Sequence, residues 1–308
     1  RDLVLLCLRL CRCATATGSF CSLDRGAMQY GPYKTLRVTK EDGILHVELN
    51  RPEKLNAMNR KFWQETRECF LAAAEDTETR VIVISAQGRA FSSGLDLNDM
   101  APLSSGEATS GKAVKRDPAR SAYRLRREVL HTQESFNAIE ACPQPVIVVG
   151  HGAVVGGGID LMCTCCIRYA SRDAWFTIKE VDVGLAADVG TLQRLPKIIG
   201  NEGVVRELAY TARKFTAEEA LRVGFLTRLF DTREEALGAA MSLAKEIGQK
   251  SPVAVIGTKR MLDFTRNHSV EDGLEYIATW NAAMLQSPDM AVAAAASLHK
   301  KTATFSKL

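Results

Sequence analysis

The chain has 308 residues, of which 46% are hydrophobic and 25% are charged, and its formal net charge at pH 7 is +4. This composition is typical of a globular protein with one large core, or with a core and a smaller helical part. We expect no membrane span, because the apolar run Leu3–Leu8, the longest near the start, is far shorter than the roughly 18 to 20 residues that span a bilayer. The net charge is small for this length, so we expect no nucleic acid partner.

The first segment, residues 1–30, is predicted to be a targeting or disordered segment. It contains four arginines and two aspartates, with Ser, Thr and Ala between them. A basic, acid-poor segment of this kind is typical of an organelle transit segment. A secretory signal is the first alternative, although Arg9 and Arg12 interrupt its apolar region. An untargeted tail is the second.

Residues 31–215 are predicted to form an α/β core, because strand-like and helix-like segments alternate along them. In chain order we expect a strand over 43–49, a helix over 60–75, a strand over 80–85, a helix over 121–141, a strand over 145–149, a helix over 156–166 and a strand over 174–178. The segment 101–118, rich in Ser, Gly, Lys and Ala, is predicted to be a surface loop.

After Phe215 the pattern predicts helices only, over 217–223, 233–251, 252–266 and 269–285. We therefore assign residues 216–308 to a C-terminal helical region. Its last three residues, Ser306-Lys307-Leu308, match the peroxisomal import tripeptide. Together with the first segment, this tripeptide predicts localisation to mitochondrion and peroxisome and an import receptor as a partner.

The nine cysteines do not form a disulfide framework, because four of them lie in the first 21 residues. The cluster Cys163, Cys165 and Cys166 lacks a second pair of ligands at zinc spacing, so we expect buried free thiols and no metal.

Three carboxylates, Asp160, Glu180 and Asp188, lie among glycines and hydrocarbon side chains. Apolar surroundings disfavour the ionised form and raise a carboxyl pKa, which suits a general acid or base near neutral pH. We therefore predict an active site. The alternative is a buried salt-bridge network, which fits Asp182 better than these three acids. The candidate cations for such a network are Lys179, Arg168, Arg172 and Arg194.

The glycine triplet Gly156–Gly158 precedes Asp160, and Ser93-Gly94-Leu95 follows a predicted buried strand. Backbone N–H groups at glycine-rich turns that lead into helices can converge on the oxygen of an enolate. Taken alone, the triplet is equally compatible with a tight turn or with close helix packing. The two turns together favour an oxyanion hole.

Four motifs in order resemble the enoyl-CoA hydratase/isomerase (crotonase) superfamily, and the match covers about residues 33 to 308. They are Leu49–Asn59, Ala90–Leu97, His151-Gly152 with Gly156–Asp160, and Gly190–Leu195. The resemblance implies an α/β fold, a crotonase-like spiral of ββα units with a C-terminal helical oligomerisation region. It also implies an acyl-CoA thioester substrate and a homo-hexamer built as a dimer of trimers.

The resemblance further implies the residues of the site. The amides of Leu95 and Gly157 would form the oxyanion hole. The segment Ser93, Gly94, Leu95, Asp96 and Leu97 would line the acyl-pantetheine channel, with Asp96 counted as structure of this loop rather than as a chemical group.

Hydratases of this superfamily have two glutamates at the positions of Asp160 and Glu180 and a glycine at the position of Asp188. The shortened first acid and the added third acid favour isomerisation of a 3,5-dienoyl-CoA to a 2,4-dienoyl-CoA in β-oxidation, by a 1,5-proton shift. Asp188 is our choice as the base at C2 and Glu180 as the acid at C6, with the direction left open. Asp160 would orient the pocket. No metal or redox cofactor is implied, because CoA is part of the substrate.

Two other functions remain open at this point. The first is hydration of a 2-enoyl-CoA, against which Asp188 and the shortened Asp160 argue. The second is RNA binding without catalysis, for which five arginines offer a basic helix: Arg116, Arg120, Arg124, Arg126 and Arg127. Most such runs are solvated helix faces.

Overall fold

The computed structural model describes residues 28–98 and 117–308. Nearly all of the predicted targeting segment and of the predicted loop over 101–118 therefore lies outside the described residues. Among the described residues, no helix is long and apolar enough to span a bilayer.

A six-stranded sheet forms the centre of the molecule, in the order β1-β2-β3-β4-β6-β9. Only the first pair, β1 with β2, is antiparallel. All residues of the central strands β3 and β4 are buried, which explains their continuous β-branched sequences. The strand bounds are β1 (Leu36–Glu41), β2 (Ile44–Leu49), β3 (Val81–Ala86), β4 (Val146–Gly150), β6 (Ile167–Ser171) and β9 (Arg228–Phe230).

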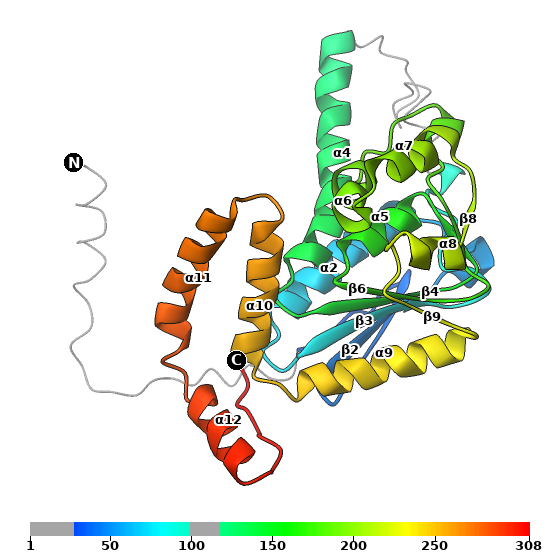
Figure 1. Ribbon diagram of the computed structural model, residues 1–308. Helices are drawn as coiled ribbons and strands as arrows, with labels where there is room; N and C mark the ends of the chain where they lie inside the picture. The colour runs from blue at the N-terminus through cyan, green and yellow to red at the C-terminus, as the bar shows by residue number, and fades with distance from the viewer. Residues whose placement is uncertain (1–27, 99–116) are drawn as a thin grey trace, which may run out of the picture.

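Helices cover both faces of this sheet (Figure 1). Helix α9 (Arg233–Gly248) lies on one face, where Ala236, Ala240 and Ala244 let it approach the strands closely. On the other face, α2 (Arg60–Glu75) buries Phe62 and Phe70 in the larger apolar core. Helix α4 (Pro118–Ala141) runs beside α2 and extends beyond the rest of the core.

From strands of the first sheet the chain continues into a second, three-stranded sheet. It consists of β5 (Ala153–Val155), β7 (Trp175–Thr177) and β8 (Phe215–Thr216). Strand β4 continues into β5 through a bend at Gly152, whose φ is +54° and where a Cβ would lie 2.3 Å from the Arg89 carbonyl oxygen. Strand β6 likewise leads into β7, through a turn in which the Ala174 amide donates to the Ser171 carbonyl at 3.0 Å. This repeated bend produces the expected spiral.

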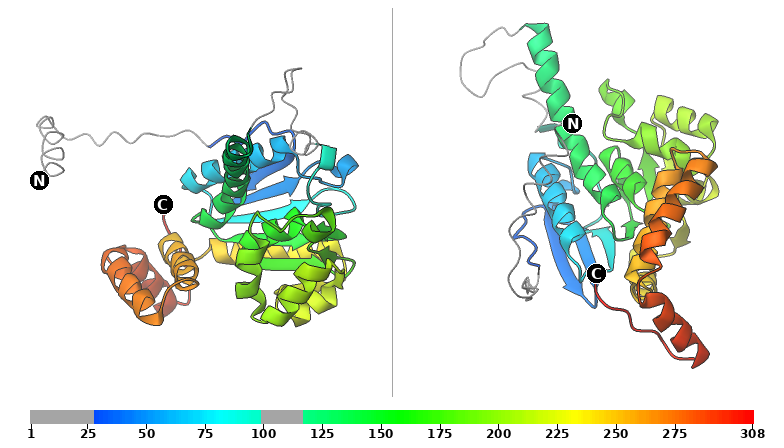
Figure 2. Two further views of the ribbon diagram at one scale, coloured as in Figure 1. Left: turned by 90° about the horizontal axis from the view of Figure 1, so that it is seen from above. Right: turned by 90° about the vertical axis from the view of Figure 1, so that its left-hand side faces the viewer.

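The remaining helices surround the second sheet and the C-terminus. They are η1 (Pro52–Lys54), α5 (Gly157–Thr164), η2 (Glu180–Val183), α6 (Thr191–Ile199), α7 (Glu202–Thr211), α8 (Ala217–Arg222), α10 (Pro252–Thr265), α11 (Val270–Met284) and α12 (Asp289–Leu298). Figure 2 shows that α10, α11 and α12 form a separate group beside the sheets.

The predicted strands and helices of the core are confirmed to within a few residues, but the expectation of helices only after Phe215 was wrong. Strand β9 pairs with β6 through Tyr169, Ala170 and Ser171, and α9 packs on the main sheet. The division at residue 215 therefore separates β9 and α9 from the sheet against which they lie. Strand β9 has only three residues, too few for an alternating pattern to show in the sequence.

Candidate active site

A cavity of about 410 Å³ contains the three acids and both glycine turns. Residues of α2 and α4 line it together with the turns before α5 and α6. The residues discussed below that line it are Met58, Trp63, Ser93, Gly94, Leu95, Leu97, Leu125, Val129, Gly156, Gly157, Asp160, Glu180, Asp188 and Val189. The structure thus brings together residues that are far apart in the sequence.

Backbone hydrogen bonds hold the two glycine turns side by side. The Ser92 amide donates to the Ala153 carbonyl at 3.0 Å, and the Val155 amide donates to the Ser92 carbonyl at 3.0 Å. The Gly156 amide donates to the Thr177 carbonyl of β7 at 3.0 Å. In the described part of the chain, the amides of Leu95 and Gly157 have no recorded backbone acceptor. Two donors at the cavity wall are therefore available to an oxygen atom.

Both turns need glycine for steric reasons. Gly94 has φ +83°, and a Cβ there would lie 3.0 Å from the Val155 carbonyl oxygen. A Cβ on Gly157 would lie 2.8 Å from the Met58 sulfur, which is itself fully buried. Because α5 begins at Gly157, its amide also stands at the positive end of a helix. The motif thus permits a close approach of backbone donors to the cavity.

Asp160 is buried in the first turn of α5, with only 1% of its surface exposed. Its Oδ1 accepts a hydrogen bond of 2.6 Å from the Thr191 amide, the first residue of α6. Burial raises the pKa of Asp160 to about 6 in spite of hydrogen bonds from Thr191, and the negative charge of Asp188 adds to the rise. Asp160 therefore connects α5 to the start of α6. With this pKa, its carboxyl group changes between the protonated and the ionised form near pH 6.

Glu180 is the first residue of the 3-10 helix η2. Lys179 pairs with Asp182, but their side chains are 49% and 46% exposed, so this pair is not the buried network of the salt-bridge alternative. The Glu180 Oε2 atom is buried and has no hydrogen-bond partner among the described residues. Burial and the charge of Asp160 raise the pKa of Glu180 to about 7. Such a carboxyl group is able to donate a proton near neutral pH.

Asp188 lies on the segment between η2 and α6 and is more exposed than the other two acids. Protein atoms around its carboxyl group still raise its pKa above the usual range by partial burial, although its own backbone amide lowers it. The Gln133 side chain of α4 donates to the Asp188 carbonyl oxygen at 2.6 Å. The acids thus differ in burial and in partners, as an acid and a base in one site must.

Of the predicted channel segment, Ser93, Gly94, Leu95 and Leu97 line the cavity, and Asp96 does not. Asp96 instead forms an ion pair with Arg51, with its Oδ2 atom 3.1 Å from Nη2. This pair fixes the loop before α2 against the Leu95 turn. Asp96 thus lies outside the lining of the cavity, although it was predicted within the channel segment.

Sequence reasoning missed the apolar walls of the site. Met58 and Trp63 form the side next to Gly157, and Leu125 and Val129 of α4 form another. The spacing of Leu125 and Val129 by four residues is a signal that could have placed one face of α4 on a cavity. The same helix carries the basic run, in which Arg120 pairs with Asp117 and Arg124, Arg126 and Arg127 are exposed, whereas Arg116 lies outside the described residues.

The cysteine cluster has no role at this cavity. Cys163 and Cys165 are buried free thiols as predicted, but Cys166 is exposed. Burial raises the pKa of Cys165 to about 12, so its thiol stays protonated. Among residues 28–98 and 117–308, no group of His, Cys, Asp and Glu has the arrangement of a metal site.

The enoyl-CoA hydratase/isomerase family model matches residues 39–305. A human protein named Delta(3,5)-Delta(2,4)-dienoyl-CoA isomerase, mitochondrial, is 51% identical over 280 residues, which cover 90% of this chain and 84% of that protein. An Arabidopsis thaliana protein named as the peroxisomal form is 42% identical over 90% of this chain and 98% of its own length. The chain therefore belongs to the enoyl-CoA hydratase/isomerase family.

Solved structures agree with this assignment. A crystal structure of a putative enoyl-CoA hydratase from Streptomyces coelicolor superposes with a TM-score of 0.80 at 27% identity, over 92% of this chain and 99% of that one. A Mycobacterium leprae protein named as a probable enoyl-CoA hydratase is 33% identical over 73% of this chain and 81% of that protein. The identity to the human and Arabidopsis isomerases is thus higher than to these two proteins named hydratases.

Proposed function

We propose that the chain isomerises 3,5-dienoyl-CoA to 2,4-dienoyl-CoA, the reaction in the names of its human and Arabidopsis relatives. The observation that carries the proposal is the meeting of Asp160, Glu180 and Asp188 in one cavity with the two glycine turns. A proton shift between distant carbons needs a base, an acid and hydrogen-bond donors that stabilise the negative charge formed on the thioester oxygen. This cavity offers groups for all three.

In the proposed mechanism, Asp188 removes a proton from C2 of the 3,5-dienoyl-CoA. The electrons move to the thioester oxygen, and the resulting dienolate is stabilised by the amides of Leu95 and Gly157. Glu180 then donates a proton to C6, and the double bonds take the 2,4-positions. Exchange with water removes the proton from Asp188 and returns a proton to Glu180, which restores both groups for the next turnover. These steps move protons only, so they use no redox cofactor, and CoA enters and leaves with the substrate.

The two acids suit these opposite tasks. Asp188 is exposed to water, whereas Glu180 has a buried oxygen without a partner among the described residues and a pKa of about 7. Asp160 carries no step in this scheme. Its hydrogen bond to the Thr191 amide keeps the start of α6, and with it Asp188, in place.

The test of the proposal is to follow 3,5-dienoyl-CoA by ultraviolet absorbance, because conjugation with the thioester in the 2,4-product changes the spectrum. We expect rapid conversion by the wild-type protein and little hydration of 2-enoyl-CoA. If the protein instead hydrates 2-enoyl-CoA and leaves the dienoyl-CoA unchanged, the proposal is wrong and the chain is a hydratase.

We also propose that the chain assembles into hexamers through its C-terminal helices. Apolar side chains are left exposed there, among them Leu262 at 65%, Leu274 at 63% and Leu298 at 84%. Residues of α10, α11 and α12 also line an apolar cavity of about 710 Å³. Light scattering after size-exclusion chromatography tests this proposal, and a monomer at micromolar concentration would contradict it.

The proposed location is mitochondrion and peroxisome, as the names of the human and Arabidopsis relatives suggest. The tripeptide Ser306-Lys307-Leu308 would engage the peroxisomal import receptor. Arg80 donates to the Ser306 carbonyl at 3.0 Å, and Lys307 pairs with Glu78. Both contacts are at the surface, so a receptor can replace them. Import assays with residues 1–30 or the tripeptide deleted test the two signals separately.

A further inference from the structure

The segment that carries Asp188 belongs to no helix or strand and has glycine near both ends. Gly184 has φ +81° and Gly190 has φ +134°, conformations that favour glycine. Val189 lines the catalytic cavity and also a second cavity of about 900 Å³, so this segment forms a wall between two open spaces. Because open space lies on two sides of this segment, contacts other than apolar packing must also hold Asp188 in place.

Polar side chains of α4 approach this segment from one helix face. Gln133, Asn137 and Glu140 follow one another at helical spacing. Gln133 donates directly to the Asp188 carbonyl oxygen at 2.6 Å. The other two bind Arg194 of α6: Nη2 donates to Asn137 Oδ1 at 2.7 Å, and Nε and Nη2 donate to Glu140 Oε2 at 2.9 and 2.8 Å.

Arg194 in turn lies directly against the segment. Its Nη1 donates to the Val189 carbonyl at 3.4 Å, and a Cβ on Gly190 would lie only 1.8 Å from the same nitrogen. Its side chain is 12% exposed. Glycine at position 190 therefore makes room for the guanidinium group. Because Arg194 is held at three points by α4, it cannot move aside without breaking charged hydrogen bonds.

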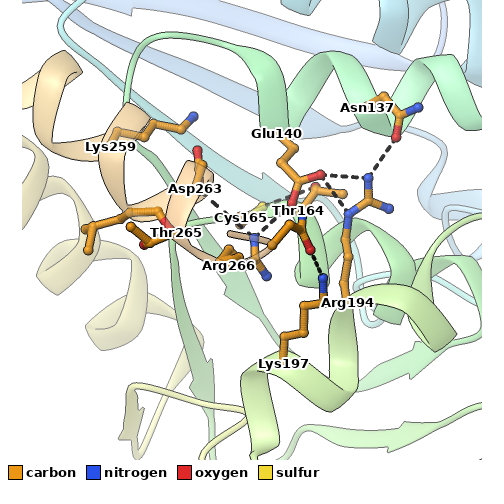
Figure 3. Close-up of polar contacts among 12 residues, drawn as sticks. Asn137, Glu140, Thr164, Cys165, Arg194, Lys197, Lys259, Asp263, Thr265 and Arg266 are labelled. Atoms are coloured by element: carbon orange, nitrogen blue, oxygen red, sulfur yellow. Dashed lines mark hydrogen bonds and ion pairs between the residues drawn. The ribbon is translucent and has the colours of Figure 1, made fainter. Parts of the chain in front are cut away.

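The C-terminal region reaches the same group of residues. Arg266, next to the end of α10, donates to the second oxygen of Glu140 at 2.9 Å, so one carboxylate binds two arginines (Figure 3). Figure 3 also shows Asn137 and Glu140 of α4 converging on Arg194. Glu140 thus connects three elements: α4, α6 and α10.

We propose that Gln133 and the Glu140–Arg194 pair are positioning residues that set the place of the Asp188 carboxylate. None of them lies at the proposed reacting atoms. Gln133 and Arg194 contact the carbonyls of Asp188 and Val189, and Glu140 acts on the segment through Arg194. The inference rests on the proposed function, in which Asp188 is the base. A displacement of a catalytic group by about 1 Å can lower a rate about 100-fold, so small shifts of this segment matter.

The first test compares Gln133→Met with Gln64→Met. Both glutamines lie on helices and donate one side-chain hydrogen bond, but Gln64 binds Glu68 on the surface of α2. We expect Gln133→Met to lower kcat about 10-fold with KM changed less than about 3-fold, and Gln64→Met to change neither. Equal kcat values for the two variants would overturn the role of Gln133.

The second test compares Arg194→Gln with Arg206→Gln, which removes an exposed arginine paired with Glu202 on α7. We expect a kcat about 100-fold lower for Arg194→Gln only, with partial recovery in Arg194→Lys. If Arg194→Gln does not fold, Glu140→Gln provides the same measurement with a smaller expected loss, because it leaves the arginine in place. A wild-type kcat in either folded variant would overturn the role of the pair.

The decisive step is to repeat Gln133→Met in an Asp188→Asn background. A residue that acts only by placing the Asp188 carboxylate loses its effect when that carboxylate is absent, so we expect no further fall in kcat. A further 10-fold fall would show that Gln133 acts elsewhere and would overturn the inference.

Hydrogen exchange of residues 184–190 gives a readout that does not depend on the reaction. We expect faster exchange in Gln133→Met and in Arg194→Gln than in their controls. Unchanged exchange would overturn the inference even if the protein turns over dienoyl-CoA. Faster exchange in a protein without such turnover would leave the positioning of the segment intact and overturn the proposed function alone.

Discussion

The glycine turns that present the Leu95 and Gly157 amides are fixed by backbone hydrogen bonds, whereas the segment that carries Asp188 is held largely by side chains. The turns are attached to neighbouring strands through Ser92 and Gly156. The Asp188 segment depends on Gln133 and Arg194. Backbone donors next to a sheet are held by the hydrogen bonds of the strands, and glycine is enough to let them approach the cavity. A carboxylate on a loop lacks such bonds, so side chains from helices distant in the sequence must hold it in place. The predictions below separate these two kinds of support.

The largest effect is expected for Asp188→Asn. Removal of a general base typically costs 10²- to 10⁴-fold, and we expect kcat for 3,5-dienoyl-CoA to fall about 10³-fold. The side chain keeps its size, so folding is unaffected. Asp182→Asn is the control, because Asp182 is exposed and pairs with Lys179 nearby. A loss of less than about 10-fold in Asp188→Asn, measured by ultraviolet absorbance, would assign the base to another group.

The next effect is expected for Gly157→Ala. The added Cβ would lie 2.8 Å from the sulfur of the buried Met58 side chain, so either this side chain or the turn that presents the Gly157 amide must shift. Losing one oxyanion donor costs about 10²- to 10³-fold, and we expect a fall in kcat of about 10²-fold. Gly238→Ala in α9 is the control, since a Cβ there meets nothing within 4 Å. Similar kcat values in the two variants would exclude the Gly157 amide from catalysis.

The pH dependence of kcat/KM sharpens the assignment of the acids. Glu180 must be protonated to donate, so activity should fall as the pH rises through its pKa of about 7. Asp188 must be ionised to accept a proton, so activity should also fall on the acid side, as the pH drops through a raised pKa. The expected profile is a bell whose alkaline limb disappears in Glu180→Gln. An alkaline limb that persists in this variant would assign the donor elsewhere.

The smallest effect is on stability. The pKa of Glu180 is higher in the folded chain than in the unfolded chain, so its ionised form destabilises the fold above pH 7 and this penalty disappears as the pH falls toward 4. Glu180→Gln should therefore raise the free energy of unfolding at pH 8 by on the order of 2 kcal/mol and change it little at pH 4. Urea denaturation at both pH values measures this, and equal effects at the two would contradict the buried charge.

The sequence predicted much of this arrangement because its signals are local. Buried strands such as Val146–Gly150 appear as runs of β-branched residues, and the glycines before Asp160 together with Ser93-Gly94-Leu95 indicate the two turns of the site. The three acids stand out because their neighbours are apolar. Each of these features depends on a few consecutive residues.

What the sequence did not predict depends on contacts between distant residues. Strand β9 exists because β6 offers it an edge, and Gln133 matters because α4 passes the Asp188 carbonyl. Asp160 was predicted as an acid in the pocket, but its hydrogen bond to Thr191 follows from the way α5 meets α6. In each case the two partners are distant in the sequence and meet only in the folded chain, so no local pattern indicates the contact.

The most direct test of the account is to run the reaction in ²H₂O and locate the label in the early product by mass spectrometry and proton NMR. If Asp188 removes the C2 proton and Glu180 supplies another at C6, the 2,4-dienoyl-CoA should carry one deuterium, at C6. A product without deuterium would mean that a single group carries the same proton from C2 to C6, and it would contradict the division of tasks between the two acids.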